Sequence, residues 1–164
     1  MRKVFYISFV VLFFYGCGIY SFTGASYGNA KTVTVKYFDN TAQIVNPDLA
    51  PMITEKLRDK FNDESPLTLV ESGGDLDFSG VIIKYDVKPV DIRAGEVAGA
   101  NRLTVSVRVK FVNNTDHKYD YDKTFSWYAD FEPDKNLADV ENELIDQITD
   151  KLVEDIFNNA VANW

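Results

Sequence analysis

Two segments of this chain alternate apolar and polar residues, and this period of two constrains the fold more than any other feature. In residues 102–110 the odd positions are apolar and the even positions are charged or hydroxylated. In residues 79–88, one face is expected to carry Val81, Ile83, Tyr85 and Val87, and the other Ile82, Lys84, Asp86 and Lys88. The segment from Tyr119 to Phe131 returns after turn residues 113–116. Such alternation is typical of antiparallel strands with one covered and one polar face. The middle of the chain therefore predicts an antiparallel meander.

Two helical patterns and two shorter strand patterns flank this meander. Ile53, Leu57 and Phe61 recur every four residues in a predicted helix that ends near Asn62, with Asn46 as N-cap and Pro47 at the first helical position. A second apolar stripe predicts a helix from about Leu137 to Asn159. The remaining expected strands are Thr32–Phe38 and Leu67–Val70. Two helices on one face of a largely antiparallel sheet of four strands, or slightly more, make an α+β two-layer sandwich.

The N-terminus has the order of a secretion signal. Two basic residues, Arg2 and Lys3, precede a short apolar run that ends at Gly16, just before Cys17. The run is too short for a permanent membrane span, which needs about 20 apolar residues. Cys17 is the only cysteine, and a cysteine directly after the cleavage point is the residue that lipoproteins acylate. Phe14 stands where such signals usually carry leucine.

The chain therefore divides into a lipoprotein signal peptide at residues 1–16, a lipidated tether at 17–30 and one α+β domain at 31–164. Gly18 follows the cysteine, so the aspartate that retains many lipoproteins in the inner membrane is absent from that position. We expect a lipid anchor in the periplasmic leaflet of the outer membrane. Without the signal, 15 basic residues face 25 acidic ones, a formal charge of −10. This balance argues against a nucleic-acid partner.

Convergent reactive groups are scarce in the sequence. His117, the only histidine, falls in a predicted turn and is interpreted as a solvated residue. No phosphate-binding loop, serine elbow or His/Cys metal spacing occurs. Glu71, Asp75 and Asp77 around a Gly-Gly turn offer a calcium site as the less favoured alternative to simple solvation. We therefore expect no enzyme activity, no cofactor and no metal.

Basic residues gather at the positions of neighbouring strands that are expected to point outward. They are Lys84, Lys88, Arg102, Arg108 and Lys110. One hypothesis is cross-strand pairing with Asp86, Asp120 and Asp122. The other is a face that docks an anionic ligand, such as a phosphorylated glycolipid, or the acidic interior of a partner.

Several stretches, in order along most of the mature chain, also carry a family resemblance. They are Cys17–Gly24, with a C-G-x-Y-x-F opening, Val33–Asn40, Thr54–Phe61, Gly74–Leu76 with Phe78–Ile82, Asn101–Val105, Phe125–Phe131 and Leu152–Trp164. Together they resemble a divergent branch of the LptE family, the lipopolysaccharide-assembly lipoproteins of the outer membrane. The resemblance implies two helices on a four-stranded sheet, in agreement with the alternation.

The resemblance implies a non-enzymatic role. Members of the family sit as a 1:1 plug in the lumen of a large outer-membrane β-barrel, the LptD translocon, support its assembly and help insert lipopolysaccharide into the outer leaflet. The family's basic ligand-contact residues lie where this chain does not match residue by residue, so none is carried over. The alternative is a free periplasmic lipoprotein that binds lipid or glycan.

Overall fold

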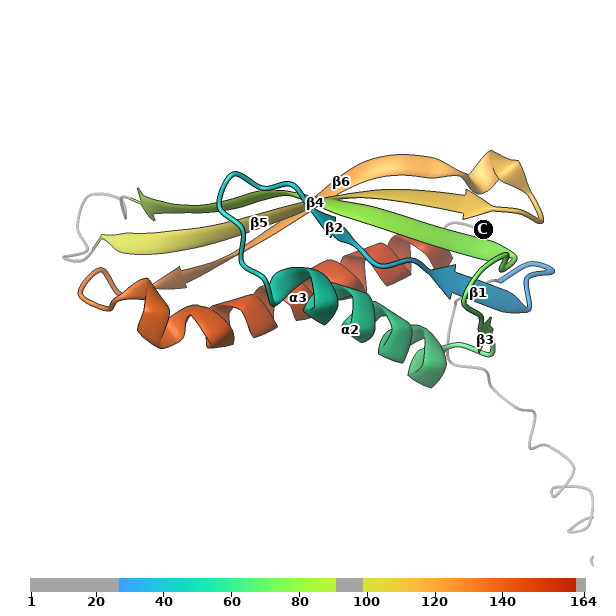
Figure 1. Cartoon of the computed structure of the whole chain (residues 1–164), viewed down its shortest axis with the longest axis horizontal. Helices are drawn as coiled ribbons and strands as arrows, with labels where there is room; N and C mark the ends of the chain where they lie inside the picture. Colours follow the sequence, from blue (N-terminus) through green and yellow to red (C-terminus); the bar gives the residue numbers. More distant parts are fainter. Residues whose placement is uncertain (1–26, 91–98, 162–164) are drawn as a thin grey trace, which may run out of the picture.

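A computed structural model of the chain describes residues 27–90 and 99–161. The predicted signal peptide, Cys17 and most of the predicted tether lie outside the described residues. Two helices cover one face of a six-stranded sheet (Figure 1), which confirms the predicted α+β class. In chain order the elements are β1 (Thr32–Val35), β2 (Asp39–Asn40), α2 (Leu49–Glu64), β3 (Thr68–Leu69), β4 (Leu76–Val90), β5 (Ala100–Asn113), the 3₁₀ turn η2 (His117–Tyr119), β6 (Tyr121–Phe131) and α3 (Leu137–Val161).

The sheet combines an antiparallel meander with a parallel edge. Its strand order is β3-β1-β4-β5-β6, and β2 pairs with β4 beyond the end of β1. The pairs β4–β5 and β5–β6 are antiparallel, as predicted, whereas β1 and β2 run parallel to β4. The parallel pairs follow because α2 and β3 lie between β1 and β4 in the sequence and return the chain to the same end of the sheet.

One residue of β4 interrupts the predicted alternation. The pairing with β5 skips from Ile82 to Lys84, so Ile83 is a β-bulge and is 43% exposed. Phe78 and Ile82 face the core before the bulge, and Tyr85 faces it afterwards. The prediction that Val81 and Ile83 share a face with Tyr85 is therefore wrong, because a bulge places two consecutive residues opposite one partner.

The predicted strand Thr32–Phe38 is shorter in the structure: β1 ends at Val35, and a separate two-residue strand, β2, follows at Asp39–Asn40, where the strand was expected to have ended. Lys36 still donates its backbone N–H to Phe78 O, but Phe38 turns under the sheet and is fully buried. Its backbone N–H donates to the Thr54 hydroxyl of α2, 3.1 Å away. The strand breaks because this buried aromatic residue pairs with a helix side chain rather than with β4.

Helix α2 begins two residues later than predicted, at Leu49 with Asp48 as N-cap. The Asn46 side-chain oxygen Oδ1 accepts from Asp48 N at 2.9 Å, and its side-chain Nδ2 donates to Glu141 of α3. Asn46 therefore forms the turn before the helix rather than the cap itself. The predicted C-terminal helix is confirmed as α3, which extends to Val161.

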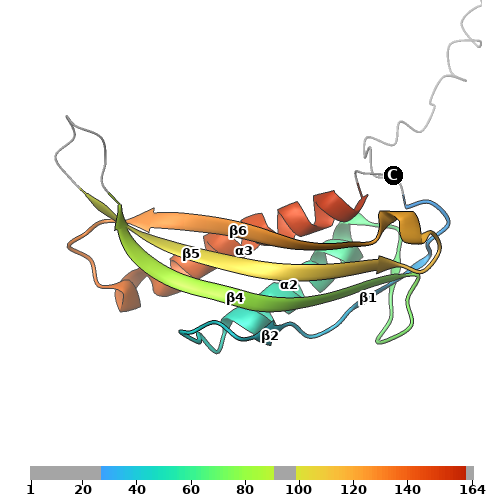
Figure 2. The same ribbon diagram turned by 90° about the horizontal axis from the view of Figure 1, so that it is seen from above.

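Figure 2 shows α3 crossing beneath the meander at an angle, so it underlies different strands along its length. The core between the layers contains a chain of aromatic rings. Phe61 of α2 lies 5.0 Å from Phe78 and 4.9 Å from Phe157 of α3, and Phe78 lies 4.8 Å from Phe111, measured between centroids. Such pairs add about 0.5–1.5 kcal/mol each beyond their buried area. Both helices are thereby fixed to one face, and the opposite face stays free for polar residues.

Candidate functional site: the outward face of the sheet

The five basic residues singled out from the sequence all lie on the sheet face that points away from the helices. The register places Lys88 opposite Arg102 and Lys84 opposite Ser106. Arg108 and Lys110 are also even-numbered residues of β5, so they lie on the same face as Arg102. After the bulge at Ile83, the even-numbered residues of β4 point outward, as predicted for Lys84 and Lys88. Whether this face binds a ligand stays a prediction, whereas its composition can be described in detail.

Two arginines of β5 form paired hydrogen bonds with aspartates of β6. Arg102 donates to both carboxylate oxygens of Asp130 at 2.7 and 2.8 Å, and Arg108 donates to both oxygens of Asp122 at 2.7 Å. Asp130 lies directly opposite Arg102, whereas Asp122 is reached diagonally because Thr124 is the residue opposite Arg108. Planar two-point pairing of this kind holds both groups in one geometry.

These pairs shift the pKa values of both partners. The hydrogen bond that Arg102 donates to Asp130 raises the pKa of Arg102, and the guanidinium in turn lowers the pKa of Asp130. In the same way, the hydrogen bond between Arg108 and Asp122 raises the pKa of the arginine and lowers that of the aspartate. The charged form of each partner is favoured, so an anionic ligand must compete with a carboxylate already in place.

The lysines of β4 share one carboxylate on their own strand. Asp86 lies 2.8 Å from Lys88 and 3.8 Å from Lys84, and the hydrogen bond from Lys88 lowers the pKa of Asp86. The cross-strand pairing hypothesis thus holds for Asp122, whereas Asp86 pairs with lysines of its own strand. It is wrong for Asp120, which accepts from Asn113 N and faces His117 instead.

Lys110 differs from the other four basic candidates. It forms no ion pair within 4.0 Å among residues 27–90 and 99–161, although it lies opposite Asp122 and its charge helps lower the pKa of that aspartate. Lys110 and Arg108 line a hollow of about 410 Å³ together with Lys36 and Tyr37, next to Gly80. The hollow also contains the carboxylates of Asp39 and Asp122. Its chemistry suits a polar headgroup that offers both anionic and hydroxyl groups.

The other sequence candidates take part in local structure. His117 lies in η2, 70% exposed, with Nδ1 3.0 Å from Asp120. The Asp75 carboxylate accepts from the backbone N–H groups of Lys31 and Thr32, and the hydrogen bond from Lys31 is the main cause of its lowered pKa. Asp77 pairs with Lys36 at 2.7 Å. In the described part of the chain no group of three His, Cys, Asp or Glu side chains is placed to hold a metal ion.

Three contributors to this face were not predicted from the sequence: Asp130, Tyr128 and Lys36. Asp130 and Tyr128 share the even parity of Asp122 on β6, so parity alone would have placed them on the outward face, whereas the pairing of Asp130 with Arg102 depends on the observed register. The Arg102 guanidinium also lies 3.6 Å from the centre of the Tyr128 ring, a cation–π contact. Lys36 follows the last residue of β1, and no sequence signal places it beside Arg108.

Within the described residues, no helix combines the length and apolar character that a bilayer crossing requires. A family model described as LptE, lipopolysaccharide-assembly, matches residues 30–160. Among curated proteins no significant match is found.

Solved structures share the fold at low sequence identity. The hypothetical protein CT253 from Chlamydia trachomatis is 11% identical, with a TM-score of 0.52 over 82% of this chain and 99% of that one. A minor lipoprotein from Acinetobacter baumannii is 12% identical, with a TM-score of 0.47 over 80% and 96%. Uncharacterized lipoprotein B from Nitrosomonas europaea is 13% identical, with a TM-score of 0.49 over 85% and 92%.

Proposed function

This chain belongs to the LptE lipopolysaccharide-assembly family, and from that premise we propose that it is a non-enzymatic outer-membrane lipoprotein that plugs an LptD-type β-barrel. In this role it forms a 1:1 complex, supports assembly of the barrel and aids insertion of lipopolysaccharide into the outer leaflet. The family match over residues 30–160 carries the proposal, because it spans both helices and every strand.

The outward sheet face supports a plug in a wide barrel, whose lumen is polar. Burial of an unpaired charge at an interface is costly, whereas a paired and hydrogen-bonded charge can be covered at a smaller cost. Arg102 and Arg108 already have two-point partners, and Asp86 serves two lysines. The face therefore presents hydrogen-bonding groups while most of its charge is neutralised within the protein.

Direct contact with lipopolysaccharide is proposed at the hollow that Lys110 and Arg108 line. A glycolipid phosphate would have to displace Asp122 from Arg108, but it would meet no bound carboxylate on Lys110. We therefore rank Lys110 first among the five basic candidates for headgroup contact. Lys110→Glu is expected to weaken binding of purified lipopolysaccharide by about tenfold or more, because one favourable contact becomes repulsive.

A matched control for this charge reversal is Lys151→Glu, which makes the same change on the helix layer, where Lys151 pairs with Glu154. Lys151→Glu should leave lipopolysaccharide binding unchanged. If Lys110→Glu and Arg108→Glu fold and keep full affinity for both lipopolysaccharide and the barrel partner, the outward face has only a structural role.

Anchoring is proposed at Cys17, with the lipid in the periplasmic leaflet of the outer membrane. Membership in a lipoprotein family supports a membrane-associated protein, and two or more acyl chains are enough for stable attachment. Mass spectrometry of the purified chain should find acyl groups on Cys17 as the first residue, and Cys17→Ser should abolish them. An unmodified Cys17 in a processed chain would contradict this part of the proposal.

The decisive experiment is affinity purification of the full chain from outer membranes, followed by identification of its partner. The proposal predicts a large β-barrel protein in equimolar amount. Recovery of the chain without any barrel protein, together with bound lipid or glycan, would favour the free periplasmic binding lipoprotein instead.

A further inference from the structure

Within residues 27–90 and 99–161, the outer edge of β6 has no strand partner. β6 pairs with β5 from Tyr121 to Phe131, and no described strand pairs with its other side. An open edge leaves every second backbone N–H and C=O without a strand partner, so it can accept an added strand.

The other edges of the sheet carry features that oppose strand addition. At the β1 edge, the guanidinium of Arg58 donates to Val35 O at 2.9 and 3.2 Å, and β3 is only two residues long. The second half of β4 extends beyond β2 but carries Lys84, Lys88 and Pro89, just after the bulge at Ile83. Short strands, lysine, proline and bulges are the means by which proteins protect exposed edges.

β6 lacks such protection over Thr124–Ala129, which contains no charge, proline or glycine. Trp127 and Tyr128 lie there, 39% and 48% exposed, with near-parallel rings whose centres are 6.4 Å apart. Arg102 is fixed over the Tyr128 ring by its two hydrogen bonds to Asp130. Tryptophan, tyrosine and arginine are the residues most enriched at energetic hot spots of protein interfaces.

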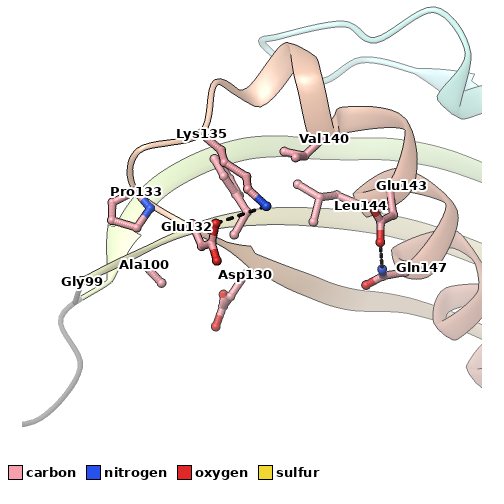
Figure 3. Close-up of a pocket in the computed structure, with 11 residues that line it drawn as sticks. Gly99, Ala100, Asp130, Glu132, Pro133, Lys135, Val140, Glu143, Leu144 and Gln147 are labelled. Atoms are coloured by element: carbon pink, nitrogen blue, oxygen red, sulfur yellow. Dashed lines mark hydrogen bonds and ion pairs between the residues drawn. The ribbon is translucent and has the colours of Figure 1, made fainter. Parts of the chain in front are cut away.

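The end of β6 is hollowed and strongly acidic. α3 contacts the start of β6 through Lys123 and Asn159, whereas at Phe131 a hollow of about 450 Å³ lies between the strand and the first turns of α3. Figure 3 shows Asp130, Glu132 and Glu143 around this hollow, with the Lys135 ammonium turned toward Glu132. Residues 130–147 contain seven acidic side chains and a single basic one.

We propose that β6 is a strand-addition site for an extended protein segment with basic side chains, which pairs with Thr124–Ala129 and extends over the acidic end of the strand. Main-chain hydrogen bonds and the exposed aromatic pair supply contact, and the acidic end selects the charge of the ligand. A second copy of this chain is a poorer occupant because it brings the same acidic residues to the edge. The inference stands on these observations and is independent of the barrel-plug proposal.

The test uses the full chain in detergent and two labelled ten-residue peptides of alternating valine and polar residues. One peptide carries lysine at the polar positions, and the other carries glutamate. Fluorescence anisotropy should show the lysine peptide binding at least about tenfold more tightly than the glutamate peptide. Amide hydrogen exchange should show new protection at Thr124–Ala129 when the lysine peptide is bound.

Trp127→Ala should weaken binding of the lysine peptide by about tenfold or more, since a hot-spot aromatic is lost. The matched control Leu69→Ala removes an apolar side chain of β3 that is 40% exposed, close to the 39% of Trp127, and should leave binding unchanged. Glu132→Gln with Glu143→Gln should reduce the preference for lysine over glutamate. Equal binding of both peptides, protection only outside β6, an unaltered affinity in a folded Trp127→Ala variant, or a dimer that blocks the edge would each overturn the proposal.

Discussion

Gly80 of β4 lies directly against the ring of Phe38, and its replacement by alanine tests how tightly the β1–β2 break is packed. A Cβ atom at position 80 would lie 2.3 Å from Phe38 Cε2, 2.5 Å from Cδ2 and 2.7 Å from Cζ. Carbon atoms in contact prefer about 3.5–4.0 Å, so the ring would have to move by about 1 Å or more. Phe38 is fully buried and its backbone is bonded to Thr54, so little space is available for that movement.

Overpacking of this kind costs about 1–3 kcal/mol. We expect Gly80→Ala to lower the unfolding free energy by that amount, which corresponds to a melting temperature lower by roughly 2–4 °C for each kcal/mol. Chemical denaturation followed by circular dichroism measures the change. The control is Gly99→Ala, where the nearest atom of the described residues to the added Cβ would be Val90 O at 3.7 Å, so that stability should change little.

A double-mutant cycle separates the steric overlap from other effects of alanine. Phe38→Leu removes Cε2 and Cζ, two of the three ring atoms that the new Cβ would strike, and leaves a more mobile δ carbon, so Gly80→Ala should cost at least about 1 kcal/mol less in that background. If the two substitutions are additive, or if Gly80→Ala is as mild as Gly99→Ala, the assignment of Phe38 to this packed position is wrong.

Two further perturbations address contacts of helix α3, one with α2 and one with β4. Lys56 of α2 forms ion pairs with Asp146 and Asp150 of α3. Burial lowers the pKa of Lys56, but the two carboxylates outweigh that effect and raise the pKa overall. The stabilisation from these ion pairs is therefore present at neutral pH and is lost as pH rises through the raised pKa. Lys56→Met should therefore be less stable than the natural chain at pH 7 by up to about 1 kcal/mol, with the gap closing in thermal melts above pH 10.5. Tyr85→Phe removes the hydroxyl that donates to Glu141 and should cost about 1–3 kcal/mol, whereas the exposed Tyr37→Phe should be neutral. An unchanged denaturation midpoint for Tyr85→Phe would contradict the role of this hydrogen bond.

The meander and the two helices could be predicted because their periods extend over many residues and depend on burial alone. Alternation in β5 continues without interruption, and the stripe of α3 spans about seven turns, so local ambiguity averages out. The division of β1 from β2 could not be predicted in this way. It depends on Phe38 meeting Thr54 and Gly80, residues distant in the sequence, and the segment itself has the composition of a continuous strand.

The face on which the candidate site residues lie could be predicted from the sequence, but the partner of each side chain could not. Outward parity on β4 and β5 placed all five basic residues on one face, since a strand's period of two is fixed by backbone geometry. Which carboxylate each meets depends on register and side-chain reach. Arg108 reaches diagonally to Asp122 and so leaves Lys110, the residue directly opposite that aspartate, without an ion pair among the described residues.

Val81, Ile82 and Ile83 are all apolar, so the sequence pattern does not show that the pairing register shifts at Ile83. Because Ile83 has no partner on β5, its deletion joins Ile82 to Lys84 in continuous pairing and keeps Tyr85 on the core face. Deletion of Asp86 instead inverts Val87 and Lys88, although both deletions shorten β4 equally. We expect the first deletion to cost less than about 1 kcal/mol and the second at least about 2 kcal/mol in chemical denaturation. Similar losses from both deletions would mean that β4 re-registers freely, and that the bulge does not set the outward face.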